Sequence, residues 1–492
     1  MSEQKQDVSF SWWRRTFFPI HMHEIQKVIP FAIIFCGIVF TYTVCRQLKD
    51  YLMVGAGGAS VIPPAKVLVM LAGVLFGFLH SKITHKYSHY HAFLISFLPF
   101  MVFFILFSIF FQHIHYVHMH PDTIIIWSKK LPALKYFIII FGNWVYCLNY
   151  IFSEMIGTLM LGATFWQLAN FYSSYDEKKR FYAFYALFAQ IGSYGAGFLM
   201  EKIGLFIKQT GKLNEGVAII TLSLFITALT IVAAVTYFFK VTLKNPLYAA
   251  DIANNDKKKH KKKVTNWKES VQNLKDHPTL ILVCLLTVWY GICSTSMETF
   301  WKGKVSELYG KDMMIFMGQY YQITSIATFL FTLICGSLVR IFPWFVVAVI
   351  TPVVVLFASF CLFGVGNPMF SGFFEKILHV NPLWLVVMVG AAVLIFFKSA
   401  KYALFDPTKE IFIGAQSEEN SIQVKSLETA VGRMGKGGSA VIQTCILAIP
   451  GMTMNNMAPI MWFITTAMGI IWIYSLIRIN KEMVLIEKKN KN

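Results

Sequence analysis

Apolar stretches of about twenty residues recur along the whole chain, separated by short polar breaks. A bilayer core about 30 Å thick needs roughly 20 residues of α-helix, so each stretch of this length predicts one spanning helix. Twelve are found, at 29–53, 66–84, 92–112, 136–173, 180–203, 217–241, 278–300, 313–339, 343–364, 383–412, 424–449 and 459–478. The fourth and tenth are too long for one straight span, so we expect part of each to tilt, break or extend beyond the hydrocarbon.

The one strong change in composition along the chain lies between the sixth and seventh stretches. Residues 244–277 contain the run KKKHKKK within a polar, charged segment. Such a segment predicts a linker that divides the chain into two halves of six helices each. The predicted parts are a leader at 1–28, a first half at 29–243, a basic linker at 244–277, a second half at 278–478 and a tail at 479–492.

The distribution of positive charge predicts how the chain lies in a membrane. Cytoplasmic loops carry an excess of lysine and arginine, so we expect the linker and both termini on the cytoplasmic side. Four lysines depart from this rule because they fall in loops assigned to the outer side, namely Lys129, Lys130, Lys202 and Lys208. The leader is aromatic and basic, and no small-residue cleavage site follows its first apolar run, so it is expected to remain uncleaved.

Glycines are concentrated at matching places in the two halves. The fifth stretch holds Gly192, Gly195 and Gly197, and the eleventh holds Gly432, Gly435, Gly437 and Gly438. Small residues at this density let helices approach closely within a membrane. Two six-helix halves joined by a cytoplasmic linker are the plan of major-facilitator transporters, which bind substrate between their halves. The pattern predicts an all-α, major-facilitator-like transporter of about 12 transmembrane helices, and it does not indicate the cargo.

The composition agrees with a membrane protein and excludes two other classes. Of the 492 residues, 56% are hydrophobic and only 14% are charged, whereas soluble domains carry about a quarter charged residues. A soluble enzyme is therefore excluded, and so is a disordered chain, because disordered chains are poor in apolar residues. The net charge of +19 is concentrated in the linker, the cytoplasmic loops and the tail, so it does not indicate a nucleic-acid partner.

Ionisable residues inside the predicted helices need a specific explanation. A charged side chain at membrane depth costs roughly 3 kcal/mol on insertion scales. The residues concerned are Arg46, Lys49 and Asp50 in the first helix, Glu154 in the fourth, Glu298 and Lys302 at the end of the seventh, Lys398, Lys401, Asp406, Lys409 and Glu410 in the tenth, and Arg433 and Lys436 in the eleventh. Lys49 and Lys302 lie near helix ends, so an alternative for both is an ammonium group that reaches the outer interface.

Four of these cations have no acidic neighbour within a helical turn. Lys398 and Lys401 are three residues apart and share a helix face, as do Arg433 and Lys436. Four unpaired cations in one empty cavity would repel each other, which points to a polyanionic ligand. Phosphate is the natural candidate, because lysine supplies a point charge and arginine a bidentate fork for its oxygens.

Three further motifs are interpreted differently. Asp406, Lys409 and Glu410 have the i, i+3, i+4 spacing of an ion pair within a helix or between the halves, and such a pair is a candidate gate. The run GRMGKGG lacks the spacing and the strand-to-helix context of a Walker loop, so an ATPase is not expected. The histidines of HIHYVHMH are irregularly spaced in an outer loop and are expected to be solvated rather than to bind a metal.

The chain is not expected to be an enzyme or to need a cofactor, because no nucleophile, base or metal constellation is found. Two alternatives from other classes fit the sequence less well than transport. A channel needs a continuous polar pore lining, whereas this chain has clustered single charges at mid-depth. A membrane enzyme acting on phospho-substrates needs paired carboxylates or histidines within the bilayer, and the histidines here nearly all lie in predicted loops.

Seven motifs occur in order along nearly the whole chain. They are RQLKDYLMV, NYIFSEMIG, TFWQLAN, DEKKRFYAFYALFAQIG, METFWKGKV, SAKYALFDPTKE and GRMGKGGSAVIQ. Together they resemble the bacterial and plastid ATP/ADP translocase family, the nucleotide transporters of rickettsia- and chlamydia-like intracellular bacteria. The resemblance implies import of host ATP in exchange for ADP and phosphate, by alternating access. It also implies functional roles for Lys49, Glu154, Glu298 and Lys436, and so favours a substrate contact for Lys49.

The chain departs from the family pattern near the predicted phosphate contacts. It has SEMIG where ATP/ADP exchangers typically have SELWG, and VKSLETAVGRMGKGG where they have VKGKAAxDVVGxRxGKSGG. A lysine and a serine of the pattern are therefore missing. Other members of the family carry GTP, UTP, CTP or NAD, in some cases with a proton. The nucleotide is thus left open, and ATP/ADP exchange stands beside proton-coupled or exchange import of another nucleotide.

The sequence thus predicts a nucleotide transporter with a phosphate site between its halves. The residues predicted to bind phosphates are Arg46 and Lys49 in the first half and Lys398, Lys401, Arg433 and Lys436 in the second. Glu154 and Glu298 are predicted to balance charge in the empty cavity or to couple a proton or phosphate, the candidate co-substrates. We expect a monomer in the inner membrane of an intracellular bacterium, with nucleotides and the lipid bilayer as its partners.

Overall fold

The computed structural model describes residues 20–173, 175–244, 278–335, 341–367, 376, 379–415 and 418–491. Throughout these ranges the regular structure is helical. Most of the predicted leader and nearly all of the predicted basic linker, at 1–19 and 245–277, lie outside the described residues. The prediction of an all-α membrane protein is confirmed.

The first half contains six long helical regions. Its main helices are α2 (Ile25–Gly57), α3 (Ile62–Lys86), α4 (His89–Phe110), α8 (Trp144–Met155) continued by α9 (Phe165–Tyr172), α10 (Tyr175–Thr210) and α11 (Leu213–Lys240). Between α4 and α8, three short helices make the connection, namely α5 (Ile114–Val117), α6 (Pro121–Lys130) and α7 (Lys135–Gly142).

The second half is built in the same way. Its main helices are α14 (Pro278–Tyr309), α15 (Met313–Cys335), α17 (Trp344–Val365), α19 (Pro382–Ala400) continued by α20 (Asp406–Ala415), α21 (Glu418–Leu447) and α22 (Ala458–Lys491). Buried apolar side chains form one large cluster drawn almost entirely from the second half and another drawn almost entirely from the first. Each half therefore has its own core.

Nine helical stretches within the described ranges are long and apolar enough to cross a membrane, and one of them, Thr279–Ile334, comprises both α14 and α15. Helices α10 and α21 correspond to the fifth and eleventh predicted spans and are 36 and 30 residues long, but they carry more charge. The chain is thus a multi-pass membrane protein. The count of twelve spans stays a prediction.

The fourth and tenth predicted spans are interrupted at matching places. A π-helical segment, Ile156–Thr164, separates α8 from α9, and another, Lys401–Phe405, separates α19 from α20. A π-helix has a wider turn than an α-helix and occurs frequently at functional sites, because it changes the direction in which the following side chains point. The expectation that neither stretch forms one straight helix is confirmed. Glu154 lies two residues before the first interruption, and Lys401 is the first residue of the second.

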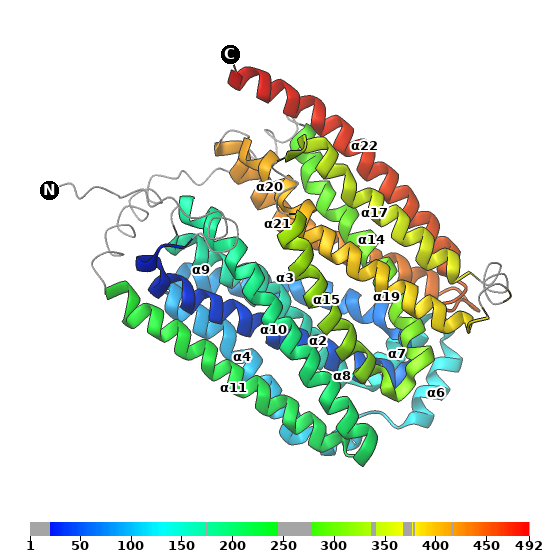
Figure 1. Cartoon of the computed structure of the whole chain (residues 1–492). Helices are drawn as coiled ribbons and strands as arrows, with labels where there is room; N and C mark the ends of the chain where they lie inside the picture. The colour runs from blue at the N-terminus through cyan, green and yellow to red at the C-terminus, as the bar shows by residue number, and fades with distance from the viewer. Residues whose placement is uncertain are drawn as a thin grey trace.

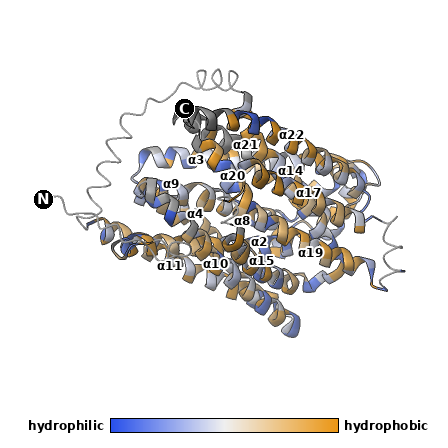
Figure 2. Cartoon of the chain, turned by 45° about the horizontal axis from the view of Figure 1, so that its top comes forward, coloured by the Kyte–Doolittle hydropathy of each residue, from blue (hydrophilic) through white to orange (hydrophobic). Residues whose placement is uncertain are grey.

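The two halves lie side by side with their chain ends at the same end of the bundle. Figure 1 shows the blue-to-green helices of the first half beside the second half, with the start of α2 and the end of α22 at one end, here called the terminal end, and α6 and α7 at the opposite, far end. The halves approach closely between α10 and α15, where a Cβ on Gly197 would lie 2.7 Å from the carbonyl oxygen of Gly318. In Figure 2, apolar residues cover the lengths of outer helices such as α11 and α17, as expected for surfaces facing lipid.

Candidate functional site: an ion-pair network between the halves

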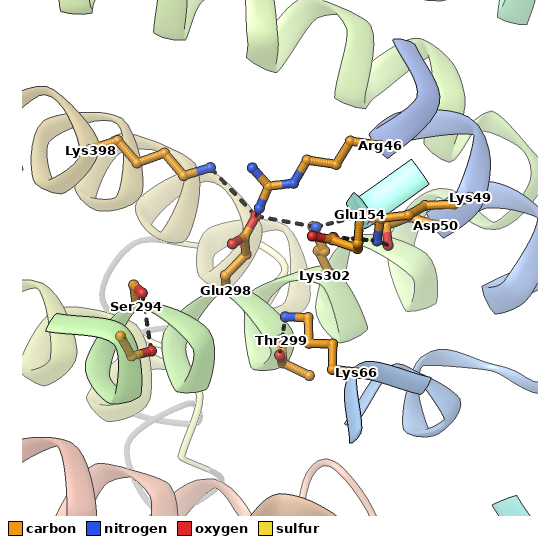
Figure 3. Close-up of polar contacts among 11 residues, drawn as sticks. Arg46, Lys49, Asp50, Lys66, Glu154, Ser294, Glu298, Thr299, Lys302 and Lys398 are labelled. Atoms are coloured by element: carbon orange, nitrogen blue, oxygen red, sulfur yellow. Dashed lines mark hydrogen bonds and ion pairs between the residues drawn. The ribbon is translucent and has the colours of Figure 1, made fainter. Parts of the chain in front are cut away.

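Charged side chains from both halves meet inside the bundle, as Figure 3 shows. Each is carried by a long helix whose other faces are apolar, so helix packing fixes where its charge lies. The contributing residues are Arg46, Lys49 and Asp50 from α2, Lys66 from α3, Glu154 from α8, Glu298 and Lys302 from α14, and Lys398 from α19. Five cations therefore face three carboxylates.

The innermost part of the network is sealed from solvent. The Lys49 ammonium lies 2.8 Å from a carboxylate oxygen of Asp50 and 3.0 Å from one of Glu154, while Lys302 lies 2.6 Å from the other oxygen of Asp50. The side chains of Lys49 and Lys302 are 0% and 1% exposed. The alternative in which these two ammonium groups reach the outer interface is therefore wrong. The ring of Tyr150, 3.5 Å from the Lys49 nitrogen, adds a cation–π contact.

Glu298 is the centre of the second part of the network. One of its carboxylate oxygens accepts from Arg46 at 2.5 Å, lies 3.2 Å from Lys302 and lies 3.5 Å from Lys398. Arg46 comes from the first half and Lys398 from the second, so two predicted phosphate ligands converge on a single carboxylate. A buried carboxylate with several cationic partners is charge-compensated, which offsets the cost of removing it from water.

Several polar contacts of the network join the two halves. They are Arg46 to Glu298, Lys302 to Asp50, and the Lys66 ammonium to the Thr299 hydroxyl at 3.2 Å. These residues of α2 and α14 lie from about two-thirds of the way along each helix onward, toward the far end of the bundle.

Nearer the far end, two exposed residues form a further contact between the halves. The Lys208 ammonium donates to Asp312 at 2.6 Å. Lys208 is one of the lysines that departed from the positive-inside rule, and this ion pair gives it a structural role. The halves are thus closed against each other at the far end.

Exposure of the charged side chains rises toward the terminal end. Arg46, one helical turn before Lys49, is 19% exposed, and Glu154 is 20% exposed. Lys398 is 16% exposed, and Lys436 on α21 is exposed. Since ion pairs join the halves at the far end and these groups are accessible, we infer that the space beside them, here called the cavity, opens toward the terminal end.

Two of the four cations predicted to be unpaired have carboxylate partners, which corrects that expectation. Lys398 contacts Glu298 on another helix, a contact that sequence spacing does not reveal. Lys401 donates to Asp406 at 2.7 Å, five residues further along. In an α-helix residues five apart do not share a face, but the π-helical turn of Lys401–Phe405 brings them together. The side chain of Arg433 lies outside the described residues.

Lys436 is exposed and, in the described part of the chain, forms no ion pair, whereas Lys66, also without an ion pair there, donates to the Thr299 hydroxyl. Its position depends on close packing of α21 against α14. A Cβ on Gly435 would lie 2.5 Å from the carbonyl oxygen of Val288, and one on Gly291 would lie 2.9 Å from the Lys436 backbone nitrogen. Lys436 interacts electrostatically with Arg46 and with both glutamates of the network. It is therefore an accessible cation at the edge of the network.

The three residues predicted to form a gate all lie on α20. Asp406 pairs with Lys401, and Lys409 is buried with its ammonium 5.7 Å from the Phe405 ring. Glu410 is exposed on α20. The gating role of these three residues stays a prediction.

One member of the network was not predicted from the sequence, and two others were not assigned to the site. Lys66 was not singled out, because it stands at the edge of an apolar stretch, directly after the Pro-Pro-Ala that begins α3. Asp50 and Lys302 were recognised as charges at membrane depth but were not assigned to the site. The same cost argument, applied to every ionisable residue at a stretch boundary, would have found Lys66.

Comparison with known proteins agrees with this architecture. The profile of the family described as "TLC ATP/ADP transporter" matches residues 3–483. The "ADP,ATP carrier protein 1" of Chlamydia pneumoniae is 32% identical over 491 residues, covering 96% of this chain and 93% of the relative. The "ADP,ATP carrier protein 5" of Rickettsia felis is 28% identical, covering 95% and 96% of the two chains.

Solved structures of similar fold are major-facilitator transporters. A D-xylose-proton symporter superposes with a TM-score of 0.56 at 11% identity, covering 92% of this chain and 97% of the symporter. A bacterial homologue of the iron transporter ferroportin gives 0.58 at 11% identity, covering 94% and 99%. At this identity the likeness concerns the fold alone, and it confirms the predicted fold class. On the full-length profile match and the 32% identical relative, the chain belongs to the TLC ATP/ADP transporter family.

Proposed function

We propose that this protein exchanges ATP for ADP by alternating access across the inner membrane of an intracellular bacterium, importing host ATP. The names of its relatives in Chlamydia and Rickettsia support this cargo. In this proposal both termini are cytoplasmic and the protein acts as a monomer. The cavity open at the terminal end then faces the cytoplasm, and the closed far end faces outward.

The observation that carries the proposal is the convergence of Arg46 and Lys398, from opposite halves, on one oxygen of Glu298. A phosphate group can replace that carboxylate, because it offers the same kind of acceptor with more charge and more oxygens. Lys436 and Arg433 extend the site along α21, and Lys401 becomes available to phosphate when Asp406 releases it. The excess of cations over carboxylates then favours a polyanion over an empty cavity.

The same ion pairs supply a reason for obligatory exchange. Without nucleotide, Arg46–Glu298 and Asp50–Lys302 hold the halves together at the far end. A nucleotide that takes Arg46 and Lys398 from Glu298 removes one of these links, so the loaded carrier reorients more readily than the empty one. Glu154 holds Lys49 in place until the network opens and the Lys49 ammonium reaches the phosphates.

Proton coupling is the second way in which this network could operate. Glu298 and Glu154 are the carboxylates that would take up a proton when a phosphate displaces them from their cations. Under ATP/ADP exchange, phosphate or the counter-nucleotide performs that displacement instead. At the terminal end, Asp406, Lys409 and Glu410 form the gate that closes when the far end opens.

An uptake assay tests the proposal. Cells or proteoliposomes containing the protein are given labelled ATP, GTP, UTP or NAD, with and without ADP preloaded inside. We expect ATP uptake that requires preloaded ADP and is insensitive to a proton uncoupler. Uptake of none of the nucleotides would reject nucleotide transport. Uptake abolished by the uncoupler but indifferent to preloading would replace exchange with proton-coupled import.

A matched pair of variants tests the site within the same assay. Lys398→Gln removes a cation that contacts Glu298, whereas Lys202→Gln removes a cation that lies 5.2 Å from the Phe198 ring on α10. We expect the first to raise the KM for ATP and the second to leave it unchanged. Equal kinetics for the two variants would contradict the phosphate site.

A further inference from the structure

Tyr402 is an exposed aromatic side chain beside the charged cavity that the proposed mechanism does not use. It follows Lys401 in the π-helical segment Lys401–Phe405, and 53% of it is exposed. The Lys401 ammonium lies 4.3 Å from the centroid of its ring. Of the other tyrosines that adjoin the network, Tyr42 beside Arg46 is only half-buried, and Tyr150, Tyr290, Tyr320 and Tyr321 are buried.

The neighbours of Tyr402 place it at the cavity and not on the lipid-facing surface. Its hydroxyl interacts electrostatically with the Lys436 ammonium on α21 and with the buried Tyr290 on α14. Lys401 also lies 5.6 Å from the Tyr290 ring, so the same ammonium stands between the two rings. A tyrosine directed to the bilayer would be remote from both helices. Tyr402 therefore lies on the side of its helix that faces α14 and α21, beside the exposed Lys436.

Two lysines lie near Tyr402, and in the described residues only one of them has a carboxylate partner. Lys401 is neutralised by Asp406 at 2.7 Å, so in this conformation it holds the ring rather than offering a free charge. Lys436 has no ion pair within the described residues and is exposed. The wall of the cavity thus presents an aromatic face next to a free ammonium, with Arg46 and Lys398 further inside.

A nucleotide has two chemically different ends, a flat heteroaromatic base and a chain of phosphates. Aromatic side chains bind bases by stacking, which tolerates any base because every base has a π-face. Cations bind the phosphates. An aromatic ring beside an accessible cation can therefore bind the base and the phosphates of one nucleotide.

We propose that Tyr402 is the platform on which the nucleobase stacks, with the phosphates directed past Lys436 toward Arg46 and Lys398. The inference rests on the proposed function, since it assigns the base end of the same nucleotide site. Lys401 supports the ring through its cation–π contact, and the π-helical turn is what directs the ring into the cavity. Stacking involves the π-face of a base and not its hydrogen-bonding edge. Tyr402 therefore contributes to affinity for nucleotides in general more than to specificity for one base.

The test compares ligands with and without a base on the purified full-length protein. Binding of ATP and of inorganic tripolyphosphate is measured for the wild type and for Tyr402→Leu and Tyr402→Phe. We expect Tyr402→Leu to weaken ATP binding by about 5- to 150-fold, the range for loss of one stacked base. Tripolyphosphate binding by Tyr402→Leu should stay within about twofold of the wild type. Tyr402→Phe, which keeps an aromatic ring, should bind ATP as the wild type does.

Tyr474→Leu is the matched control. Tyr474 on α22 is 54% exposed and also carries a cation over its ring, Arg478 at 5.4 Å, but it is remote from the network in sequence and in its contacts. Its replacement should change the binding of neither ATP nor tripolyphosphate. Thermal unfolding of each variant checks that it is folded, and Tyr402→Gln replaces Tyr402→Leu if the leucine variant is not.

Two results would contradict the proposal that Tyr402 stacks on the base. One is an equal loss of ATP and tripolyphosphate binding in Tyr402→Leu, which would mean that the ring acts through Lys401. The other is unchanged ATP binding. Failure of the proposed function is distinguishable, because it would appear as absent ATP/ADP exchange by the wild type, whether or not ATP binding depends on Tyr402.

Discussion

Ala59 and Gly303 offer a direct way to test whether the far end must open during transport. Ala59 belongs to the first half, just after α2, and Gly303 lies on α14 in the second. A Cβ built on Gly303 would be 3.5 Å from the Cβ of Ala59. Disulfides require Cβ atoms about 3.5–4.5 Å apart. The double variant Ala59→Cys, Gly303→Cys is therefore expected to form a bridge between the halves without backbone movement.

The effect of the bridge follows from these distances. It permits the two Cβ atoms to separate by only about 1 Å before the disulfide geometry is exceeded. Gly303 directly follows Lys302, whose ammonium lies 2.6 Å from Asp50, so a bridge here holds that ion pair within hydrogen-bonding range as well. A far end fixed in this way cannot open for a nucleotide. Exchange should fall by at least about a hundredfold, since the only alternative is breakage of a covalent bond.

The assay measures ATP/ADP exchange in proteoliposomes before and after reduction, with bridge formation followed by mass spectrometry. Reduction should restore exchange to the level of the two single variants, Ala59→Cys and Gly303→Cys, which serve as controls. ADP binding to the oxidised protein should persist, because the cavity stays open at the terminal end. Complete bridging with undiminished exchange would refute the reasoning that the halves separate at this end.

The remaining predictions concern the cations and the packing that positions them. Lys436→Ala should raise the KM for ATP by about 10- to 150-fold, the value of a charge-assisted hydrogen bond, with an unchanged Tm because its side chain is exposed; normal uptake kinetics would remove it from the phosphate site. Lys49→Ala should instead lower stability by about 3–5 kcal/mol as well as transport, because it removes the ion-pair partner of Glu154 and leaves Asp50 with Lys302 alone, and an unaltered unfolding curve in detergent would argue against this. Gly435→Ala should cost about 1–3 kcal/mol and reduce transport by pushing α21 from α14, whereas Gly438→Ala, with open space around it, should do neither; thermal unfolding of both variants decides. Neutralising the lysines within 257–263 should alter membrane orientation, measured by labelling from either side, more than substrate affinity.

The sequence by itself determined the class of the protein and singled out most of the charged residues that form the network. Membrane insertion depends on local hydrophobicity over about twenty residues, which can be read along the chain without knowing how helices pack. The cost of a charge at membrane depth is local in the same sense, and it singled out Arg46, Lys49, Glu154, Glu298 and Lys436. The two stretches too long for straight helices were also visible as lengths.

Only the tertiary structure decided which charge meets which. Arg46 and Glu298 are 252 residues apart, and Lys398 and Glu298 are 100 apart, yet each pair is in contact. Coulomb interaction depends on the distance between atoms, which the packing of α2, α14 and α19 sets and no local pattern records. For the same reason the sequence could not distinguish Lys302 from an interfacial lysine. The pairing of Lys401 with Asp406 could not be predicted either, because it requires a π-helical turn that no sequence pattern indicates.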